Sequence, residues 1–279
     1  MGAGARGAPS DAPPLDGQLT APFELGVGPG ACLLLHGFTG TPWDVRPLGE
    51  SLAAGGFRVR GLRLPGHGTT PRAMLDAGAE DWLAACEEGL AGFREPRVAV
   101  VGLSMGALLA LVLAARHPDR VQAVVGMAPA VRFKDRLTRG LRLARPISLA
   151  VAERLLHPWV HKATTDLADP VARAAAPVLA AWPLRRLRDL WAIQDLAWAA
   201  APKVRAPVLL AVARHDGVVD AQGTRALARR LGRAASVRFI ELERGAHIMP
   251  RDEGRLVLQQ EVLAFLRRAR TLDSGAPTV

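Results

Sequence analysis

Short segments rich in strand-forming residues alternate with amphipathic segments along most of this chain. The predicted strands are Ala31–Leu35, Phe57–Arg60, Val98–Val101, Val121–Met127, Val208–Ala213 and Val237–Leu242. The segments between and after them carry apolar residues at helical spacing, and the predicted helices are Pro42–Ala54, Ala79–Phe93, Gly106–Arg116, Gln222–Leu231 and Glu253–Ala269. Strands that alternate with helices predict a parallel sheet covered by helices on both faces, which is an α/β fold.

One long block interrupts this alternation. Residues 131–203, between the fourth and fifth predicted strands, are rich in Arg, Leu, Ala and Trp and contain no clear strand. Several of its side chains fall on one helical face: Leu184, Leu187, Trp191, Gln194 and Trp198. The block predicts a helical cap inserted into an α/β core of residues 19–130 and 204–270, with a disordered leader at 1–18 and a disordered tail at 271–279.

The segment from Val98 to Ala115 could be mistaken for a membrane span, because it is uncharged over about the length that such a helix needs. Gly102 and Gly106 flank Ser104 in its middle, with strand formers before them and helix formers after them. This pattern favours a strand, a tight turn and a buried helix, and predicts no transmembrane segment. Because the leader also lacks an apolar signal segment, we expect a cytoplasmic protein.

Composition narrows the functional classes further. Of the 279 residues, 49% are hydrophobic and 22% are charged, which is typical of a globular protein. The two cysteines, Cys32 and Cys86, are too few for a disulfide framework or a Cys-based zinc cluster, and they suit a reducing compartment. The net charge of +10 comes almost wholly from scattered arginines, so we expect no nucleic-acid partner.

The segment GLSMG, from Gly102 to Gly106, matches the pattern G-x-S-x-G between a predicted strand and a predicted helix, the context that this motif requires. Residues without side chains on either side permit a strained, tight turn that lifts the Ser104 hydroxyl above the sheet edge. The same turn places the Met105 N–H at a helix start, where an unpaired donor can face a developing negative charge. Ser104 is therefore the predicted nucleophile.

A serine nucleophile needs a base, and the base needs an orienting carboxylate. His247 lies in the loop after the last predicted strand, and Asp216 directly follows the strand before it. Both positions are at carboxyl ends of parallel strands, where sites gather in such sheets. The order Ser104, Asp216, His247 is that of the α/β-hydrolases. Asp220 is the alternative acid, but we interpret it as the N-cap of the following helix.

The turn HGFTG, from His36 to Gly40, follows the first predicted strand. Its glycines allow a sharp backbone turn, which would present the Phe38 N–H as a second oxyanion donor beside that of Met105. We interpret His36 as a structural residue that hydrogen bonds hold in the turn. No metal is expected, because the remaining histidines show no convincing metal-ligand spacing; they are His67, His117, His157, His161 and His215. No cofactor is expected either, because the chain has no nucleotide-binding glycine motif.

Five motifs, in their order and spacing, resemble those of microbial carboxylesterases and monoacylglycerol-lipase-like members of the α/β-hydrolase superfamily. They are HGFTGTPWD, LPGHGTTP, GLSMGA, ARHDGVVD and GAHIM. The resemblance covers roughly residues 20–270. It implies a Ser104–His247–Asp216 triad, oxyanion donors at Phe38 and Met105, and a cap between the core strands. Ala107 and the long, Arg-rich cap depart from the family pattern.

The resemblance implies hydrolysis of short- to medium-chain esters or monoacylglycerols through an acyl-enzyme intermediate. The alternatives are a thioesterase, a lysophospholipase, a carbon–carbon bond hydrolase and a non-catalytic binding protein on the same fold. The cap holds thirteen Lys or Arg against six Asp or Glu, which favours anionic substrates or transient contact with a lipid surface. Trp159, Trp182, Trp191 and Trp198 also lie there and could line an acyl pocket. Oligomeric state is left open.

Overall fold

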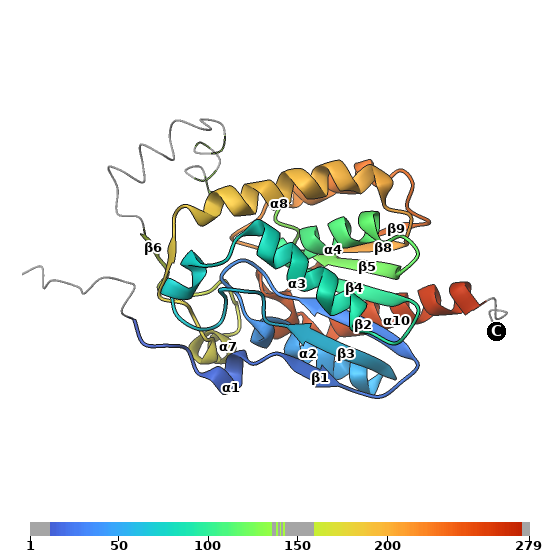
Figure 1. Cartoon of the computed structure of the whole chain (residues 1–279), viewed down its shortest axis with the longest axis horizontal. Helices are drawn as coiled ribbons and strands as arrows, with labels where there is room; N and C mark the ends of the chain where they lie inside the picture. The colour runs from blue at the N-terminus through green and yellow to red at the C-terminus, as the bar shows by residue number, and fades with distance from the viewer. Residues whose placement is uncertain (1–11, 136–137, 139, 141, 143–158, 275–279) are drawn as a thin grey trace, which may run out of the picture.

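The computed structural model describes residues 12–135, 138, 140, 142 and 159–274. Seven strands form one sheet in the order β1-β3-β2-β4-β5-β8-β9 (Figure 1). Their bounds are Phe23–Leu25 (β1), Gly30–Leu35 (β2), Phe57–Leu62 (β3), Val98–Leu103 (β4), Val121–Met127 (β5), Val208–Ala213 (β8) and Val237–Leu242 (β9). All neighbouring pairs are parallel except β1 and β3, so the predicted α/β fold with a mostly parallel sheet is confirmed.

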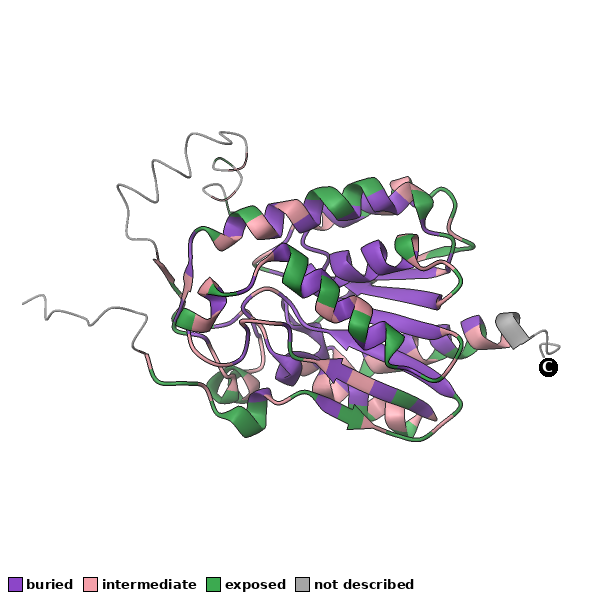
Figure 2. Ribbon diagram, in the orientation of Figure 1, coloured by how far each residue is buried: buried purple, intermediate pink, exposed green. Residues whose placement is uncertain are grey.

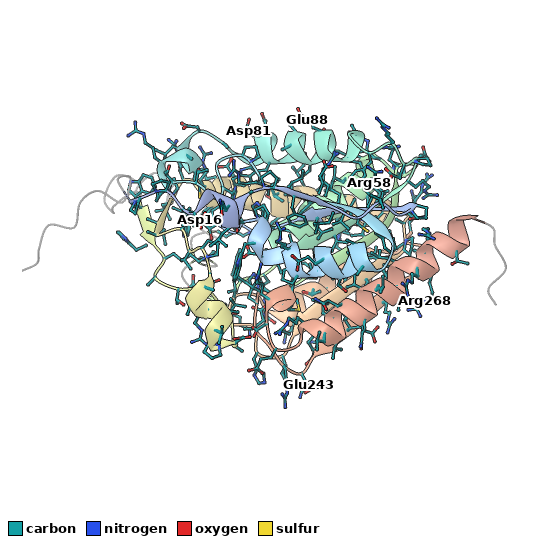
Figure 3. The ribbon with its side chains drawn as sticks, turned by 90° about the horizontal axis from the view of Figure 1, so that it is seen from below. Asp16, Arg58, Asp81, Glu88, Glu243 and Arg268 are labelled. Carbon is teal, nitrogen blue, oxygen red and sulfur yellow. The ribbon has the colours of Figure 1, made fainter. Side chains whose placement is uncertain are left out.

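Helices cover both faces of this sheet. They are α1 (Gly17–Thr20), α2 (Pro42–Ala54), α3 (Ala79–Ala91), α4 (Met105–Arg116), α8 (Arg186–Ala200), α9 (Ala221–Arg230) and α10 (Arg255–Ser274), with 3-10 turns at Arg72–Leu75, Ala201–Lys203 and Met249–Arg251. Helices α3, α4 and α8 contact one another on one face, and α2 contacts α10 on the other. Figure 3 shows α3, with Asp81 and Glu88 on its outer side, opposite α10, which carries Arg268.

The hydrophobic core includes the central strands of the sheet and most of α4. Every residue of β2, β4 and β5 is buried, and so is α4 from Met105 to Ala114, while the outer faces of the peripheral helices are exposed (Figure 2). The uncharged stretch from Val98 to Ala115 is therefore a buried strand and a buried helix separated by Ser104, as predicted. Among the described residues, no helix is both long enough and apolar enough to span a bilayer.

The insertion between β5 and β8 is not purely helical, and the prediction that it contains no strand is wrong. Strand β6 (Trp159–His161) pairs antiparallel with β7 (Ala181–Pro183), and α7 (Pro170–Ala175) lies between them in the chain. Three-residue strands are too short to show an alternating pattern in the sequence. Strand β6 and α7 lie at the end of the sheet toward which the parallel strands point, whereas α8 packs on α4 and belongs to the helical layer (Figure 1).

The two ends of the chain differ in part from the expectation of disorder. Within the predicted leader, Leu15 donates its N–H to the carbonyl of Thr69 at 2.9 Å, and Asp16 caps α1, which begins at Gly17. At the other end α10 continues to Ser274, past the expected start of the tail at residue 271. Residues 1–11 and 275–279 lie outside the described part of the chain.

Candidate active site

Ser104 lies at the junction of β4 and α4, in a turn that only small neighbours permit. Its backbone angles are φ +57° and ψ −112°, which side-chain-bearing residues rarely adopt. A Cβ at Gly102 would lie 2.1 Å from the Gly106 carbonyl oxygen, and one at Gly106 would lie 2.4 Å from that of Leu35. The two glycines of the G-x-S-x-G motif therefore allow strand and helix to approach closely enough to form the turn.

Asp216 and His247 come together from the loops after β8 and β9, which are neighbouring parallel strands. His247 Nδ1 is 2.9 Å from Asp216 Oδ2. The other carboxylate oxygen, Oδ1, accepts the N–H groups of Val218 and Val219 at 2.8 Å each. Because three hydrogen bonds fix the carboxylate, it holds the imidazole with Nδ1 toward itself and leaves Nε2 for other contacts.

The surroundings of Asp216 keep its carboxylate ionised. Burial by itself would raise the pKa of this carboxyl, but the charge and hydrogen bond of His247 and the N–H groups of Val219 and Val218 outweigh burial and lower it. An ionised carboxylate beside Nδ1 favours a proton on that nitrogen and stabilises a positively charged imidazolium.

Ser104 and His247 line one cavity of about 430 Å³, which loops of the sheet and residues of the insertion enclose. Ser104 is 6% exposed and His247 is 9% exposed, so both are largely shielded from solvent yet open to the cavity. Phe38 and Gly37, from the turn after β2, line the same cavity. A Cβ at Gly37 would lie 3.1 Å from Ser104 Cβ, which places this turn directly against the serine.

The two predicted oxyanion donors belong to residues near Ser104: Met105 follows it in the chain, and Phe38 lies in the turn against it. Met105 is the first residue of α4, so its N–H has no partner within the helix. Phe38 lies in the turn that the Gly40 N–H closes on the Gly37 carbonyl at 3.0 Å. Among the described residues, neither the Phe38 nor the Met105 N–H donates a hydrogen bond to the protein, and Phe38 lines the cavity.

The prediction that His36 is structural is confirmed. Its Nδ1 lies 2.8 Å from the Gly37 carbonyl oxygen, and its Nε2 accepts the Leu64 N–H at 3.1 Å. This pattern requires a neutral ring with its proton on Nδ1, because a protonated Nε2 could not accept. Burial, with the neighbouring His67 and in spite of the bond to Gly37, lowers the pKa of His36 to about 3.

Three charged residues that line the cavity, Asp44, Lys162 and Asp166, were not predicted as site residues. Lys162, just after β6, donates from Nζ to Thr39 Oγ1 at 3.0 Å and so ties the insertion to the turn that carries Phe38. Asp44, near the start of α2, is 6% exposed and also lines the cavity. Burial raises the pKa of Asp44 and lowers that of Lys162. Asp44 ends the motif HGFTGTPWD but was given no role, whereas no motif marks Lys162, whose place in the cavity depends on the path of the insertion.

Of the four tryptophans considered for an acyl pocket, Trp182 on β7 lines the cavity. Its ring lies edge-on to that of Phe38, with centroids 5.1 Å apart. Trp191 is 1% exposed within the helical layer, whereas Trp198, which was placed on the same helical face, is 37% exposed on α8.

Other sequence interpretations can also be checked. Asp220 is the N-cap of α9 and accepts the Gln222 N–H at 2.9 Å, as predicted. His67 was expected in a turn or on the surface; it closes a turn by donating its N–H to the Leu64 carbonyl at 3.0 Å, and it is 2% exposed. His157, one of the histidines for which no metal site was expected, lies outside the described residues.

Comparisons with known proteins place the chain in a family. The family model described as serine aminopeptidase, S33, matches residues 29–254. A thermostable monoacylglycerol lipase from Bacillus sp. (strain H-257) is 44% identical over 110 residues, which are 39% of this chain and 42% of that lipase, so the chain matches less than half the length of this relative. A carboxylesterase from Bacillus subtilis (strain 168) is 25% identical over 255 residues, or 88% of this chain and 96% of that enzyme.

Solved structures share the fold. A structure from the metagenome-derived lipolytic enzymes LipS and LipT has a TM-score of 0.79 and 24% identity, and it covers 89% of this chain and 98% of that one. The monoacylglycerol lipase of Paleococcus ferrophilus has a TM-score of 0.72 and 18% identity with the same two coverages. The chain belongs to the serine aminopeptidase S33 family of α/β-hydrolases and is a serine hydrolase that resembles carboxylesterases and monoacylglycerol lipases.

Proposed function

We propose that this protein hydrolyses carboxylic esters with Ser104 as nucleophile, His247 as base and Asp216 as the orienting acid. The observation that carries the proposal is the 2.9 Å pair of His247 and Asp216 beside a cavity that His247 shares with Ser104 on its strained turn. Nucleophile, base and orienting acid are the three groups that acyl transfer through a serine needs.

In the first half of the reaction Ser104 Oγ attacks the ester carbonyl carbon and gives its proton to His247 Nε2. The carbonyl oxygen becomes an oxyanion, which the N–H groups of Phe38 and Met105 stabilise, each contributing about 3 kcal/mol. The carbon–oxygen bond to the alcohol then breaks, and the alcohol leaves with the proton from His247. Asp216 stabilises the imidazolium while it exists.

In the second half a water molecule attacks the acyl-enzyme and gives a proton to His247. The bond from the acyl carbon to Ser104 Oγ breaks, and His247 returns the proton to that oxygen. The acid product leaves, and the free enzyme is restored with no cofactor consumed.

The substrates that we propose are esters of short- to medium-chain acids, including monoacylglycerols. The cavity of about 430 Å³ has room for a small ligand, and Trp182 and Phe38 give part of its wall an apolar surface. A monoacylglycerol lipase and a carboxylesterase among the relatives support the same class. A series of p-nitrophenyl esters of graded chain length, with matched thioesters, would separate this class from a thioesterase.

We also propose that residues 131–203 act as a cap that contacts a lipid surface transiently. Net positive charge in this block supports that contact, although Arg136, Arg139, Arg145 and Arg154 lie outside the described residues.

A cytoplasmic location is part of the proposal, because Cys32 and Cys86 are both buried and unpaired.

The decisive test is Ser104→Ala. We expect this variant to keep its circular dichroism spectrum and to lose at least about a thousandfold of its turnover of p-nitrophenyl butyrate, because the nucleophile is gone. A fluorophosphonate probe should label the wild type and not the variant. Turnover retained in Ser104→Ala would refute the assignment, and a wild type that the probe leaves unlabelled would indicate a non-catalytic binding protein.

A further inference from the structure

A carboxylate from the insertion contacts both loops that carry the proposed acid and base. Asp166 lies in the segment between β6 and α7, and its Oδ2 accepts the backbone N–H of His247 at 3.0 Å. The same oxygen accepts the N–H of Gly217, the residue after Asp216, at 2.8 Å. One oxygen atom therefore joins two loops that are about thirty residues apart in the chain. The bonds lie next to His247 and Asp216, whose relative position depends on these loops.

Backbone contacts reinforce this bridge. The Asp166 carbonyl accepts the N–H of Ile248 at 3.3 Å, so one residue of the insertion binds two consecutive residues of the histidine loop. On the other loop, a Cβ at Gly217 would lie 3.0 Å from Asp166 Oδ1, so a glycine at this position leaves room for the carboxylate. The side chain of Asp166 also lines the cavity beside His247.

A second carboxylate holds the other side of the histidine loop. Asp252, which is fully buried, accepts the Ala246 N–H at 2.7 Å on Oδ2 and, from the insertion, the N–H groups of Ala168 at 2.8 Å and Asp169 at 2.9 Å. Burial would raise the pKa of Asp252, but these N–H groups and that of Glu253 lower it, so the group is an ionised acceptor. The segment from Asp166 to Asp169 is thereby fixed to the histidine loop.

We propose that Asp166 is a positioning residue. From the insertion it binds the loops of both His247 and Asp216, and so keeps these two side chains in the relative position that catalysis needs. The inference rests on the proposed function of the triad. Its physical basis is that hydrogen bonds to a charged acceptor are strong and short, and that a displacement of about 1 Å in a reacting group can cost about a hundredfold in rate. The insertion thus has a role in organising the reacting groups as well as in forming the wall of the cavity.

The test compares three variants with the wild type. Asp166→Ala removes both bridging bonds, whereas Asp166→Asn keeps a carbonyl oxygen that can accept both N–H groups, since both now point to the same atom. Asp169→Ala is the matched control: its carboxylate also accepts two backbone N–H groups, but they belong to α7 and not to a triad loop. For each variant, fluorophosphonate titration counts the reactive sites, and kcat and KM for p-nitrophenyl butyrate are then expressed per titrated site.

We expect Asp166→Ala to lower kcat per titrated site at least about tenfold with little change in KM, and to slow inactivation by the fluorophosphonate in proportion. Asp166→Asn should recover most of this loss, and Asp169→Ala should stay within about twofold of the wild type. A purely structural role would instead reduce the number of titrated sites and the melting temperature, and leave kcat per site unchanged.

If Asp166→Ala does not fold, Asp166→Glu replaces it, because the longer side chain keeps the charge but displaces the carboxylate. Its kcat per site should then fall below that of Asp166→Asn. Equal kcat per site in Asp166→Ala and Asp169→Ala, or in Asp166→Glu and the wild type, would overturn the inference. Either result leaves the proposed function intact, provided that wild-type turnover depends on Ser104, whereas turnover independent of Ser104 would remove the basis of both.

Discussion

At the scale of single residues, Ser104 combines the reacting hydroxyl with an unfavourable backbone. Its φ of +57° is held by a hydrogen bond from its N–H to the Met127 carbonyl at 2.8 Å, while its own carbonyl accepts the N–H groups of Ala107 and Ala130 at 3.2 and 3.3 Å. Such conformations cost about 1–3 kcal/mol and persist where the surrounding structure enforces them. Strand β5 and the start of α4 provide that enforcement here.

This strain can be measured by comparing Ser104→Gly with Ser104→Ala. Glycine relieves the strain but increases the entropy of the unfolded chain by about 0.4–1 kcal/mol, so we expect Ser104→Gly to be more stable than Ser104→Ala by roughly 1 kcal/mol. Both variants lack the hydroxyl, so the comparison isolates the backbone. Urea unfolding measures it, and a glycine variant less stable than the alanine variant would show that the strain is smaller than this entropy cost.

The proposed triad could be identified from the sequence because each member has a distinctive side chain at a strand end. Ser104 lies within a five-residue motif, and the order Ser104, Asp216, His247 restricts the choice of partners. Asp166 could not be found in this way, since its partners are backbone N–H groups, which every non-proline residue carries. Its position depends on where the insertion returns to the sheet, and no local pattern encodes that.

At the scale of elements, the sequence predicts strands of six or seven residues better than strands of three. The bounds of β5, β8 and β9 agree with the predicted ones, because long runs of strand formers leave little ambiguity. Strand β1 was missed, since it has three residues and pairs at the edge of the sheet. Trp198 was placed on the same helical face as Trp191, but its side chain is exposed, and the Arg230 guanidinium lies 4.6 Å from its ring centroid.

Strand β7 brings an aromatic wall to the cavity, and this gives a second prediction. Trp182→Ala should lower kcat/KM for p-nitrophenyl octanoate about tenfold and have a smaller effect on the acetate, because a longer acyl chain would bury more apolar surface on the indole. Trp198→Ala is the matched control, since the same change on α8 is remote from the cavity. Equal losses on both esters would mean that Trp182 supports the Phe38 turn and does not contact the acyl chain.

At the scale of the whole molecule, two buried histidines, His36 and His67, lie beside the turn that carries Phe38. His67 lies 5.1 Å from His36 and 5.4 Å from Trp82 of α3, measured between ring centroids. Its Nδ1 is 3.0 Å from the Pro65 carbonyl oxygen, and its Nε2 has no partner among the described residues. Burial, opposed by the bond to Pro65, lowers the pKa of His67 to about 4.

Buried histidines that stay neutral make the folded protein sensitive to acid. Both His36 and His67 have folded-state pKa values below the ordinary value of about 6.5, so below that pH the unfolded chain takes up protons that the folded chain does not. The free energy of unfolding therefore falls as the pH falls, by up to about 1.4 kcal/mol per pH unit for each histidine, until the folded-state pKa is reached. Above about pH 7 neither group contributes to this dependence.

His67→Phe tests this dependence without leaving a new unpaired group, because the Pro65 carbonyl also accepts the Trp82 Nε1–H at 3.0 Å. We expect the variant to lose roughly 1.5 kcal/mol less unfolding free energy than the wild type between pH 6.5 and pH 5, since one of the two neutral histidines no longer opposes folding in acid. Urea unfolding of both proteins at several pH values gives the two slopes. Parallel slopes would mean that His67 is protonated in the folded protein at pH 5, and hence that solvent reaches the ring behind the Phe38 turn.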